Sequence, residues 1–328
     1  MAGLLTVGEA LYDWVSTDAG ADLASARHFV KAPGGAPLNV AVGAARLGVE
    51  TAFAGRVGDD PFGHALLDLL VREGVDTRLA RVAAERQTRM AYVLTREDGD
   101  RHLAGFSTVA CADAALTPED LPESAITDAR AFYFGALMLA DPHARAVMLD
   151  AARRAHAGEG LVVFDPNWRL VMWPDADELR AVVDEAIATS HLLKLGDDEL
   201  SWLTGLELEA GANALFARHD LAALVVTCGA QGCYFKTARA AGHVPSYAVR
   251  CVDATGAGDG FVAGLLAGLL ARDDGMPMPA QVRRLDGPAW HELLTEANAV
   301  GALATTQPGA VSALPRREAL DNFLATRR

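Results

Sequence analysis

An acidic residue lies inside a glycine-rich segment in the last quarter of the chain, between Asp253 and Gly260. This segment, Asp-Ala-Thr-Gly-Ala-Gly-Asp-Gly, is followed by an apolar, helix-forming run from Phe261 to Ala271. Glycine lets the backbone come close to a bulky anion, and the first amides of the following helix point toward it. The segment therefore predicts an anion cradle made by the amides of Gly256, Ala257 and Gly258.

Asp259 places a negative charge in the middle of this cradle, where it is a poor ligand for phosphate. A carboxylate suits a base that takes the proton from a hydroxyl group attacking phosphorus. The alternative is that Asp259 only caps the helix, a common use of this residue type. The local sequence alone favours the cap, and the catalytic interpretation depends on the rest of the chain.

Two other glycine-rich phosphate motifs are excluded by spacing and position. A dinucleotide fingerprint needs Gly-x-Gly-x-x-Gly after an early strand, with an acidic residue about 20 residues further on. A Walker A loop needs Gly-x-x-x-x-Gly-Lys followed by Ser or Thr, and the chain has no such sequence. The cradle therefore indicates a different design for phosphoryl transfer.

Composition bounds the class of protein. The 328 residues suffice for one large α/β domain with a small appendage or for two domains. The net charge is −14, from 43 acidic and 29 basic residues without a basic cluster, which argues against nucleic acid as a partner. The N-terminal segment contains Glu9 and Asp13 and lacks the basic start of a signal peptide. The longest apolar runs, about ten or eleven residues, are too short to span a bilayer, so we expect no membrane partner and a cytoplasmic protein.

The cysteines are not arranged as a Cys-x-x-Cys pair. Three of the four lie in apolar, strand-like segments, and the set is Cys111, Cys228, Cys233 and Cys251. We therefore expect buried free thiols rather than disulfides or a zinc site.

Short apolar strands alternate with helical patterns along most of the chain. Strands are expected at Leu4 to Val7, Thr51 to Val57, Ala131 to Phe134, Leu161 to Phe164, Leu192 to Leu195 and Ala223 to Thr227. Helices are expected at Pro37 to Leu47, Pro61 to Glu73, Pro142 to Ala157 and Ala176 to Ser190. This alternation predicts a mainly parallel sheet covered on both faces, with ligands at the carboxyl ends of the strands.

Two stretches break this rhythm, roughly residues 10–32 and 86–108. They alternate apolar and polar residues, and the second turns at residues 97–100. We expect a small antiparallel sheet, separate from the main one, that covers the site as a lid. Residues 272–289, with Pro277, Pro279 and Gly287 among them, are expected to be a surface excursion.

Two separated segments carry a more specific signal than composition does. The first is Pro33 to Ala41, Pro-Gly-Gly-Ala-Pro-Leu-Asn-Val-Ala, and the second runs from Asp253 to Phe261, about 215 residues later. Together they resemble the signatures of the PfkB-type, ribokinase-like sugar kinases. The runs Gly8 to Asp13 and Ala112 to Asp120 resemble fructokinases within that family.

The resemblance implies a ribokinase-like three-layer α/β/α sandwich, with residues 1–328 forming a single domain and the lid a subdomain. It implies a kinase that transfers a phosphoryl group from ATP to a primary hydroxyl of a free sugar, with fructose as the first choice. Alternatives in this class are a 2-keto-3-deoxygluconate kinase, a ribokinase and a nucleoside kinase. The alternative from another class is a non-catalytic regulator that binds sugar or nucleotide. The expected partners are a sugar, ATP and a second copy of the chain, bound through the lid.

The residues that the resemblance assigns to the sugar are Asp13, Gly34, Gly35, Asn39 and Arg169. A carboxylate and an amide suit vicinal hydroxyl groups, which both donate and accept hydrogen bonds. Arg169 is suited to steady phosphoryl oxygens. Without the family, Asp13 is equally well a turn residue, the glycines a loop before a helix, and Asn39 a residue bonded to nearby backbone.

The residues that the resemblance assigns to the nucleotide are Thr227, Gly229, Gly232 and Asn298. Thr227 to Gly232 would form a loop after a strand, and Asn298 would lie beside the adenine. The sequence Cys-Gly-Ala-Gln-Gly-Cys-Tyr-Phe is equally consistent with a plain strand–turn–strand unit. The alternative for Asn298 is a polar helix residue that faces solvent.

Two ions accompany ATP in the family, Mg²⁺ and K⁺. The resemblance places magnesium at Glu199, bound through water because this ion keeps much of its hydration; the alternative is a solvated carboxylate at a helix start. It places a monovalent cation at Asp253 and the stretch Thr305 to Ser312, and the alternative is that Asp253 only starts a turn.

The chain departs from the family pattern at two places. Gly196 replaces the Asn or small hydroxyl residue found three positions before the magnesium acid in relatives. Ser107 and Thr108 replace a Tyr-Arg pair that fructokinases commonly carry before the Ala112 to Asp120 run. The second departure weakens the assignment of fructose and leaves the kinase assignment unchanged.

Overall fold

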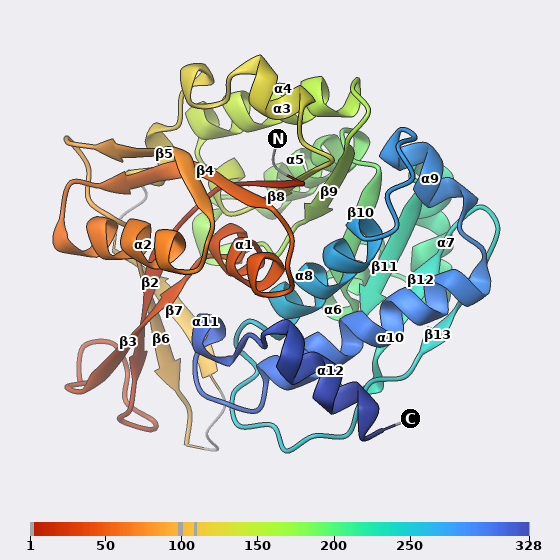
Figure 1. Ribbon diagram of the computed structural model, residues 1–328. Helices are drawn as coiled ribbons and strands as arrows, with labels where there is room; N and C mark the ends of the chain where they lie inside the picture. The colour runs from red at the N-terminus through yellow and green to blue at the C-terminus, as the bar shows by residue number, and fades with distance from the viewer. Residues whose placement is uncertain (1–2, 98–100, 108–109, 328) are drawn as a thin grey trace.

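The computed structural model describes residues 3–97, 101–107 and 110–327 (Figure 1). Its centre is a nine-stranded sheet with the order β13-β12-β11-β10-β9-β8-β1-β4-β5. These strands are β1 (Leu4–Val7), β4 (Thr51–Gly58), β5 (Asp76–Ala83), β8 (Ala131–Gly135), β9 (Leu161–Asp165), β10 (Leu192–Gly196), β11 (Ala223–Thr227), β12 (Cys233–Lys236) and β13 (Ala241–Val244). The pairings from β5 to β11 are parallel, whereas β12 and β13 are antiparallel at one edge. All the strands predicted from the sequence are present, and β5 and β13 extend the sheet beyond them.

Helices cover both faces of this sheet (Figure 1). Along β8 the residues alternate between the faces: Phe132 and Phe134 pack with one helical layer, and Ala131 and Tyr133 with the other. The first layer contains α4 (Pro142–His156), α5 (Ala176–Ala188) and α7 (Leu208–Arg218), and the second α1 (Ala36–Arg46), α8 (Ala257–Leu270), α9 (Met278–Arg284) and α10 (Gly287–Ala304). The remaining helices are α2 (Pro61–Arg72), α3 (Glu123–Thr127), α6 (Asp197–Thr204), α11 (Ala310–Ala313) and α12 (Arg317–Ala325). The three-layer sandwich is confirmed.

The starts of the predicted helices agree with the structure because their capping signals are local. α2 and α4 each begin with a proline in the first turn, preceded by an aspartate. Asp60 accepts hydrogen bonds from the amides of Phe62 and Gly63, and Asp141 from those of His143 and Ala144. Proline costs nothing at this position because its missing N–H would have no partner in the helix.

The prediction of a surface excursion over residues 272–289 is wrong for α9. Met278 and Val282 are fully buried and belong to the same apolar cluster as Trp290 of α10. The helix is short and begins after a proline, so its apolar face was hidden among turn-forming residues. The segment therefore covers the end of the sheet rather than leaving it.

A second sheet stands apart from the first, in the order β3-β2-β6-β7. Its strands are β2 (Leu11–Ser16), β3 (Phe29–Gly34), β6 (Met90–Thr95) and β7 (Arg101–Phe106). The expected antiparallel pairing holds for β2 with β3 and for β6 with β7, whereas β2 and β6 run parallel. The predicted turn at 97–100 lies mostly outside the described residues, as does Thr108. We call this sheet the lid. In Figure 1 it is at the lower left, and it projects from the main sheet.

The structure also shows the surroundings of the cysteines and the apolar character of the helices. Cys111, Cys228, Cys233 and Cys251 all lie in the described part of the chain and form no disulfide there, and Cys111 and Cys233 are buried as predicted. Cys228 is half-buried and Cys251 is exposed, so the expectation of burial is wrong for Cys251, which follows an irregular loop rather than lying in a strand. Within the described residues, no helix has both the length and the apolar character needed to cross a membrane.

Candidate active site

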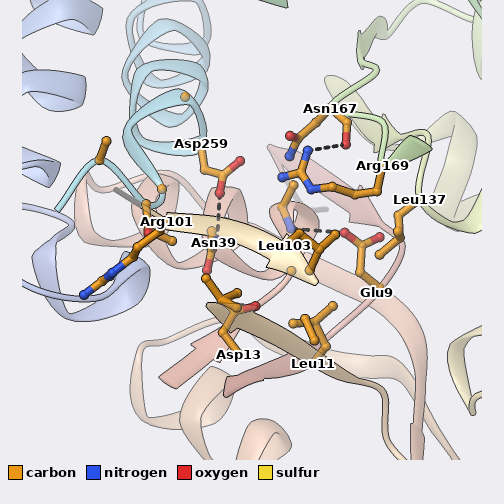
Figure 2. Close-up of a pocket in the computed structure, with 18 of the residues that line it drawn as sticks. Glu9, Leu11, Asp13, Asn39, Arg101, Leu103, Leu137, Asn167, Arg169 and Asp259 are labelled. Carbon is orange, nitrogen blue, oxygen red and sulfur yellow. Dashed lines mark hydrogen bonds between the residues drawn. The ribbon is translucent and has the colours of Figure 1, made fainter. Parts of the chain in front are cut away.

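A cavity of about 440 Å³ lies between the carboxyl ends of the central strands and the lid. The main domain contributes Asn39, Arg169 and Asp259 to its wall, and the lid contributes Asp13 and Arg101. Figure 2 shows Asp259 and Asn39 pointing toward each other, with Asp13 below them. The structure thus brings together predicted residues that are up to 246 positions apart in sequence, from Asp13 to Asp259.

Asp259 is part of the first turn of α8 and not its cap. The helix begins at Ala257, earlier than the predicted start at Phe261, after Gly256 in a left-handed conformation with φ of 80°. The side chain of Asp259 is buried and accepts a hydrogen bond of 2.7 Å from Nδ2 of Asn39 on α1. A capping carboxylate would bond to amides of its own helix. The interpretation of Asp259 as a helix cap is therefore wrong.

The cradle has two free amides rather than three. The N–H of Ala257 donates to the carbonyl of Ala254 within the turn. The N–H groups of Gly256 and Gly258 have no hydrogen-bond partner among the residues that the structure describes. An anion at the start of α8 would meet these two amides and the positive end of the helix dipole.

Lys194 reaches the cradle from the neighbouring strand β10. A Cβ atom built on Gly258 would lie 3.1 Å from its Nζ, so the ammonium group comes close to the backbone of Gly258. Nζ also lies 3.2 and 3.3 Å from the two carboxylate oxygens of Asp165 at the end of β9. Burial alone would lower the pKa of Lys194, but Asp165, Glu199 and Asp259 outweigh it and raise the pKa. A charged ammonium group therefore stands beside the anion cradle.

The two acids of the cavity have displaced pKa values. Burial raises the pKa of Asp259 to about 6, against the opposing hydrogen bond from Asn39. Burial raises the pKa of Asp13 to about 6 as well, and the positive charge of Arg169 opposes this. Both remain largely ionised at neutral pH, and a base poised near the working pH is efficient in proton transfer.

The glycine pair before α1 is required by close contacts. A Cβ on Gly34 would lie 2.4 Å from Oδ2 of Asp13, inside any real contact. Gly35 has φ of 102°, and a Cβ there would lie 2.6 Å from the carbonyl oxygen of Glu9. The pair therefore does more than link β3 to α1, because it lets the backbone pass beside Asp13 at the cavity wall.

Arg169 lines the cavity after an unusual turn. It follows Asn167, whose φ of 39° is the only left-handed non-glycine conformation among the described residues. The Nη1 atom of Arg169 donates hydrogen bonds to the carbonyls of Asn167 and Trp168. These bonds hold the guanidinium group beside the cavity. The remaining donors of Arg169 stay available for an oxyanion.

A second cavity of about 580 Å³ lies on the other side of the cradle. Its wall contains the four residues assigned to the nucleotide, Thr227, Gly229, Gly232 and Asn298. Both cavities are lined by Ala254 and Gly258, so they meet at the start of α8. The polar groups of the cradle are therefore accessible from both sides.

The alternatives for the nucleotide residues separate clearly. The strand–turn–strand unit is present, since β11 and β12 pair antiparallel, and its turn also lines the second cavity. Asn298 is buried rather than facing solvent, and its Nδ2 donates to the carbonyls of Val244 and Pro245. The alternative for Asn298, a polar helix residue that faces solvent, is therefore wrong.

Glu199 and Asp165 form an acidic pair at the ends of β9 and β10. Oε2 of Glu199 accepts the N–H of Gly196, which replaces the side-chain contact that Gly196 lacks. Burial raises the pKa of Glu199 to about 7, with Lys194 opposing and Asp165 reinforcing the shift. Carboxylate oxygens, here from the buried Asp165 and the half-buried Glu199, are the ligands that a divalent cation such as Mg²⁺ prefers. Among the described residues, no group of three or more His, Cys, Asp or Glu side chains lies close enough together to hold a metal ion.

Asp253 connects the cradle to the late loop and to the lid. Oδ1 accepts from the N–H and hydroxyl of Thr255, and Oδ2 from the N–H of Gly309, whose φ is 81°. Arg101 of the lid forms an ion pair with the same carboxylate. Burial would raise the pKa of Asp253, but these hydrogen bonds and Arg101 lower it overall, so the group is charged. A monovalent cation fits this charge, and Arg101 already balances part of it.

The comparisons with known proteins agree with this geometry. The model of the pfkB family of carbohydrate kinases matches residues 1–317. The chain belongs to this family. The probable fructokinase-4 of Arabidopsis thaliana is 36% identical over 322 residues, covering 98% of this chain and 96% of that protein. As a family member, the protein is an ATP-dependent carbohydrate kinase.

Solved structures of other pfkB kinases have the same fold. A fructokinase from Xylella fastidiosa with bound ATP superimposes with a TM-score of 0.89 at 30% identity, covering 100% of this chain and 99% of that one. A double mutant of fructokinase from Vibrio cholerae, with fructose, ADP and a potassium ion bound, superimposes with a TM-score of 0.85 at 33% identity, covering 99% and 98%. The ribokinase-like architecture of this kinase is thereby established.

Three residues of the site, Lys194, Glu9 and Arg101, were not assigned a role from the sequence. Lys194 had a signal, because lysine in a buried apolar strand is rare unless it is paired. Glu9 had one too, as an acid directly after the buried strand β1. Arg101 had none, since its partner Asp253 lies 152 residues away and only the position of the lid brings them together.

Proposed function

We propose that the protein phosphorylates the primary hydroxyl group of fructose with ATP. The observation that carries this proposal is the position of Asp259. It is a buried carboxylate in the wall of the first cavity, one residue from Gly258, where that cavity meets the second one. A sugar in the first cavity and ATP in the second would present a hydroxyl and a phosphoryl group on the two sides of the cradle.

The transfer needs a proton acceptor and a site for charge. Asp259 takes the proton as the hydroxyl oxygen bonds to the γ-phosphorus, and the bond from phosphorus to the bridging oxygen of ADP breaks. The hydrogen bond from Asn39 holds the carboxylate in place for this step. Negative charge on the phosphoryl oxygens is met by the amides of Gly256 and Gly258 and by the ammonium group of Lys194. The amide of Ala257, engaged with Ala254, supports the turn instead.

Two ions complete the proposal. Asp165 and Glu199 would hold Mg²⁺ through water, and Asp253 with the loop around Gly309 would hold K⁺. Magnesium neutralises charge on the phosphates of ATP when it is bound. Hydrogen bonds from Thr255 and Gly309 hold the carboxylate of Asp253 in place. They therefore position the segment before the cradle whether or not a cation is bound.

The choice of fructose rests on the relatives and on the sugar residues. Asp13, Gly35, Asn39, Arg169 and Asp259 all line one cavity. The relatives named as fructokinases align over nearly the whole chain. The absence of the Tyr-Arg pair in this sequence, where Ser107 is followed by Thr108, keeps ribose, 2-keto-3-deoxygluconate and nucleosides as the competitors to test.

An ADP-release assay over a panel of sugars tests this proposal. We expect the highest kcat/KM with fructose. A tenfold higher kcat/KM with ribose, a ketodeoxy acid or a nucleoside would overturn the choice of acceptor. No ADP release with any acceptor would instead favour a regulator that binds sugar or nucleotide without catalysis.

A homodimer formed through the lid is a further part of the proposal. β3 is an edge strand of the lid, and Val30 on it is 60% exposed, which is unusual for an apolar residue on an unpaired edge. Light scattering with wild type and Val30→Lys tests this, and a monomeric wild type would contradict it. ATP as the phosphoryl donor supports action in the cytoplasm.

A further inference from the structure

Glu9 is a buried acid in the sugar cavity that the mechanism above does not use. It follows β1 at the carboxyl edge of the sheet, is 4% exposed, and lines the cavity. Its Oε1 accepts a hydrogen bond of 3.1 Å from the N–H of Ala36, the first residue of α1. Its Oε2 has no hydrogen-bond partner on another described residue. The carboxyl group is therefore held by the amide of Ala36 and by its own backbone N–H while it lines the cavity.

The walls around Glu9 are apolar. Leu11, Leu103 and Leu137 line the same cavity, and Leu11 and Leu137 pack with Phe106 in one apolar cluster. In Figure 2 Glu9 and Leu137 are on the right of the view, and Asp259 is left of the centre. A polar group in such a wall determines orientation, because a ligand oxygen placed elsewhere along it finds no partner.

The cation whose charge acts on Glu9 is already paired with another acid. This cation, Arg89, forms a two-pronged ion pair with Asp113, with distances of 2.6 and 2.8 Å, and both side chains are 1% exposed. Behind Glu9, Tyr133 of β8 is buried and stays neutral because burial raises its pKa. The other ionisable side chains of the cavity are Asp13, Arg101, His102, Arg169, Lys194 and Asp259.

The protonation of Glu9 follows from these surroundings. Burial raises the pKa of Glu9 to about 8; backbone amides and Arg89 oppose the shift, and Asp113 adds to it. At neutral pH the carboxyl group is therefore mainly neutral and carries an O–H donor. Asp13, in the same cavity, is mainly a carboxylate and can only accept.

We propose that Glu9 is a specificity-determining residue, whose carboxyl group donates a hydrogen bond to an oxygen of the acceptor sugar remote from the hydroxyl that is phosphorylated. This inference rests on the proposed function, since it places a sugar in the first cavity. With a neutral donor at Glu9 and a charged acceptor at Asp13, the cavity favours one orientation of the bound sugar. An analogue that lacks the matching oxygen leaves a buried carboxyl group unpaired, and such sites reject such analogues strongly.

The first experiment compares wild type with Glu9→Gln, which keeps an acceptor for Ala36 and a donor for the sugar but does not ionise. The kcat/KM of the best acceptor in the panel is measured from pH 6 to pH 9.5. We expect the wild-type value to fall above about pH 8 and the Glu9→Gln value to stay level there. The same alkaline fall in both proteins would overturn the proposal. Asp141→Asn, the same kind of change at an exposed helix cap, should keep the wild-type profile.

A second variant tests the contact itself. Glu9→Ala should lose about 10- to 100-fold in kcat/KM with the intact sugar. It should lose much less with one particular monodeoxy analogue, the one that lacks the oxygen bonded to Glu9. An equal loss with every analogue would contradict the assignment. If Glu9→Ala does not fold, the pH profile of Glu9→Gln decides alone.

Thermal unfolding of the ligand-free protein gives a readout that needs no activity. The folded pKa of Glu9 is above the ordinary value of 4.5, so the neutral group contributes its full stability below pH 4.5. That stability is lost as the pH rises toward about 8, because ionisation is harder in the folded protein. The melting temperature of Glu9→Gln minus that of wild type should therefore increase from pH 5 to pH 9. A constant difference would contradict a neutral Glu9, whereas failure of fructose alone in the panel would bear only on the proposed function.

Discussion

Four helices of the scaffold begin differently from the two helices that form the site. The helices α2, α4, α5 and α10 each follow an aspartate whose side chain accepts hydrogen bonds from first-turn amides. The helices α1 and α8 follow glycines with φ of 102° and 80°, and neither glycine provides a side-chain cap. A cap occupies the amides that an anion would otherwise bind. The comparison shows that first-turn amides are capped in these four scaffold helices and left for other partners at the two site helices.

The two site helices also differ from each other. The first amide of α1 is met by Glu9, whereas Gly256 and Gly258 at the start of α8 keep free amides. The helices pack so closely that a Cβ on Gly43 of α1 would lie 2.7 Å from the Cβ of Ala263 on α8. Their first turns are joined by the bond between Asn39 and Asp259. In the proposed mechanism, the start of α1 positions the base through Asn39, and the start of α8 receives the phosphoryl group.

The largest effect is expected at Asp259. Asp259→Asn keeps size and hydrogen bonding but cannot accept the proton, so turnover should fall by about 10²- to 10⁴-fold with little change in ATP affinity. In wild type, kcat/KM should rise with pH through about 6, where Asp259 loses its proton, and Asp13 should steepen this rise. Steady-state kinetics and a melting curve measure both effects. A variant with native melting temperature and more than about a tenth of wild-type turnover would rule out base catalysis.

The next effect is expected at Asp13, which in our proposal binds the sugar without taking the proton. Asp13→Ala removes a charged partner of a hydroxyl group, which should cost about 1.5–3 kcal/mol, roughly 10- to 150-fold in kcat/KM for fructose. The specificity constant for fructose is the measurement, with ATP saturating. Unchanged kinetics would show that the sugar lies elsewhere in the cavity.

The architecture was predictable because its signals are local. Buried strands such as β8 are continuous apolar runs, and starts such as that of α4 carry an Asp-Pro signal. The exposed edge strand β5 was missed because it alternates weakly, with Arg78 and Arg81 among its residues. The helix α9 was missed because its turn-forming residues hid two buried side chains.

The site was predictable only where a residue type is unusual in its local context. The acid within the glycine-rich segment pointed to Asp259, but the start of α8 was placed too late because glycine is a poor helix former. Lys194, Glu9 and Arg101 act through partners that are distant in sequence, such as the Arg101–Asp253 pair across 152 residues. Such pairs follow from the packing of the lid on the sheet, which no local pattern encodes.

A smaller effect is expected from potassium at Asp253. A fixed cation beside the cradle would order the amides of α8 without touching the substrates, so rates should be higher in potassium than in a large organic cation at matched ionic strength. Arg101 already neutralises part of this charge. Arg101→Gln should therefore make activity more dependent on potassium. Equal wild-type rates in both salts would contradict a cation at this position.

The smallest effect on activity is expected at a scaffold cap, Asp141 of α4. Its Oδ1 accepts the N–H groups of His143 and Ala144 at 2.9 and 3.0 Å. Asp141→Ala leaves these amides to water and should destabilise the protein by about 1 kcal/mol, with kcat and KM unchanged. Asp141→Asn should behave as wild type because asparagine caps nearly as well. Chemical denaturation and kinetics measure the two sides of the comparison. The same Asp-to-Asn change thus separates a helix start built for stability from one built for chemistry, and a loss of turnover at Asp141 comparable with that at Asp259 would remove the distinction.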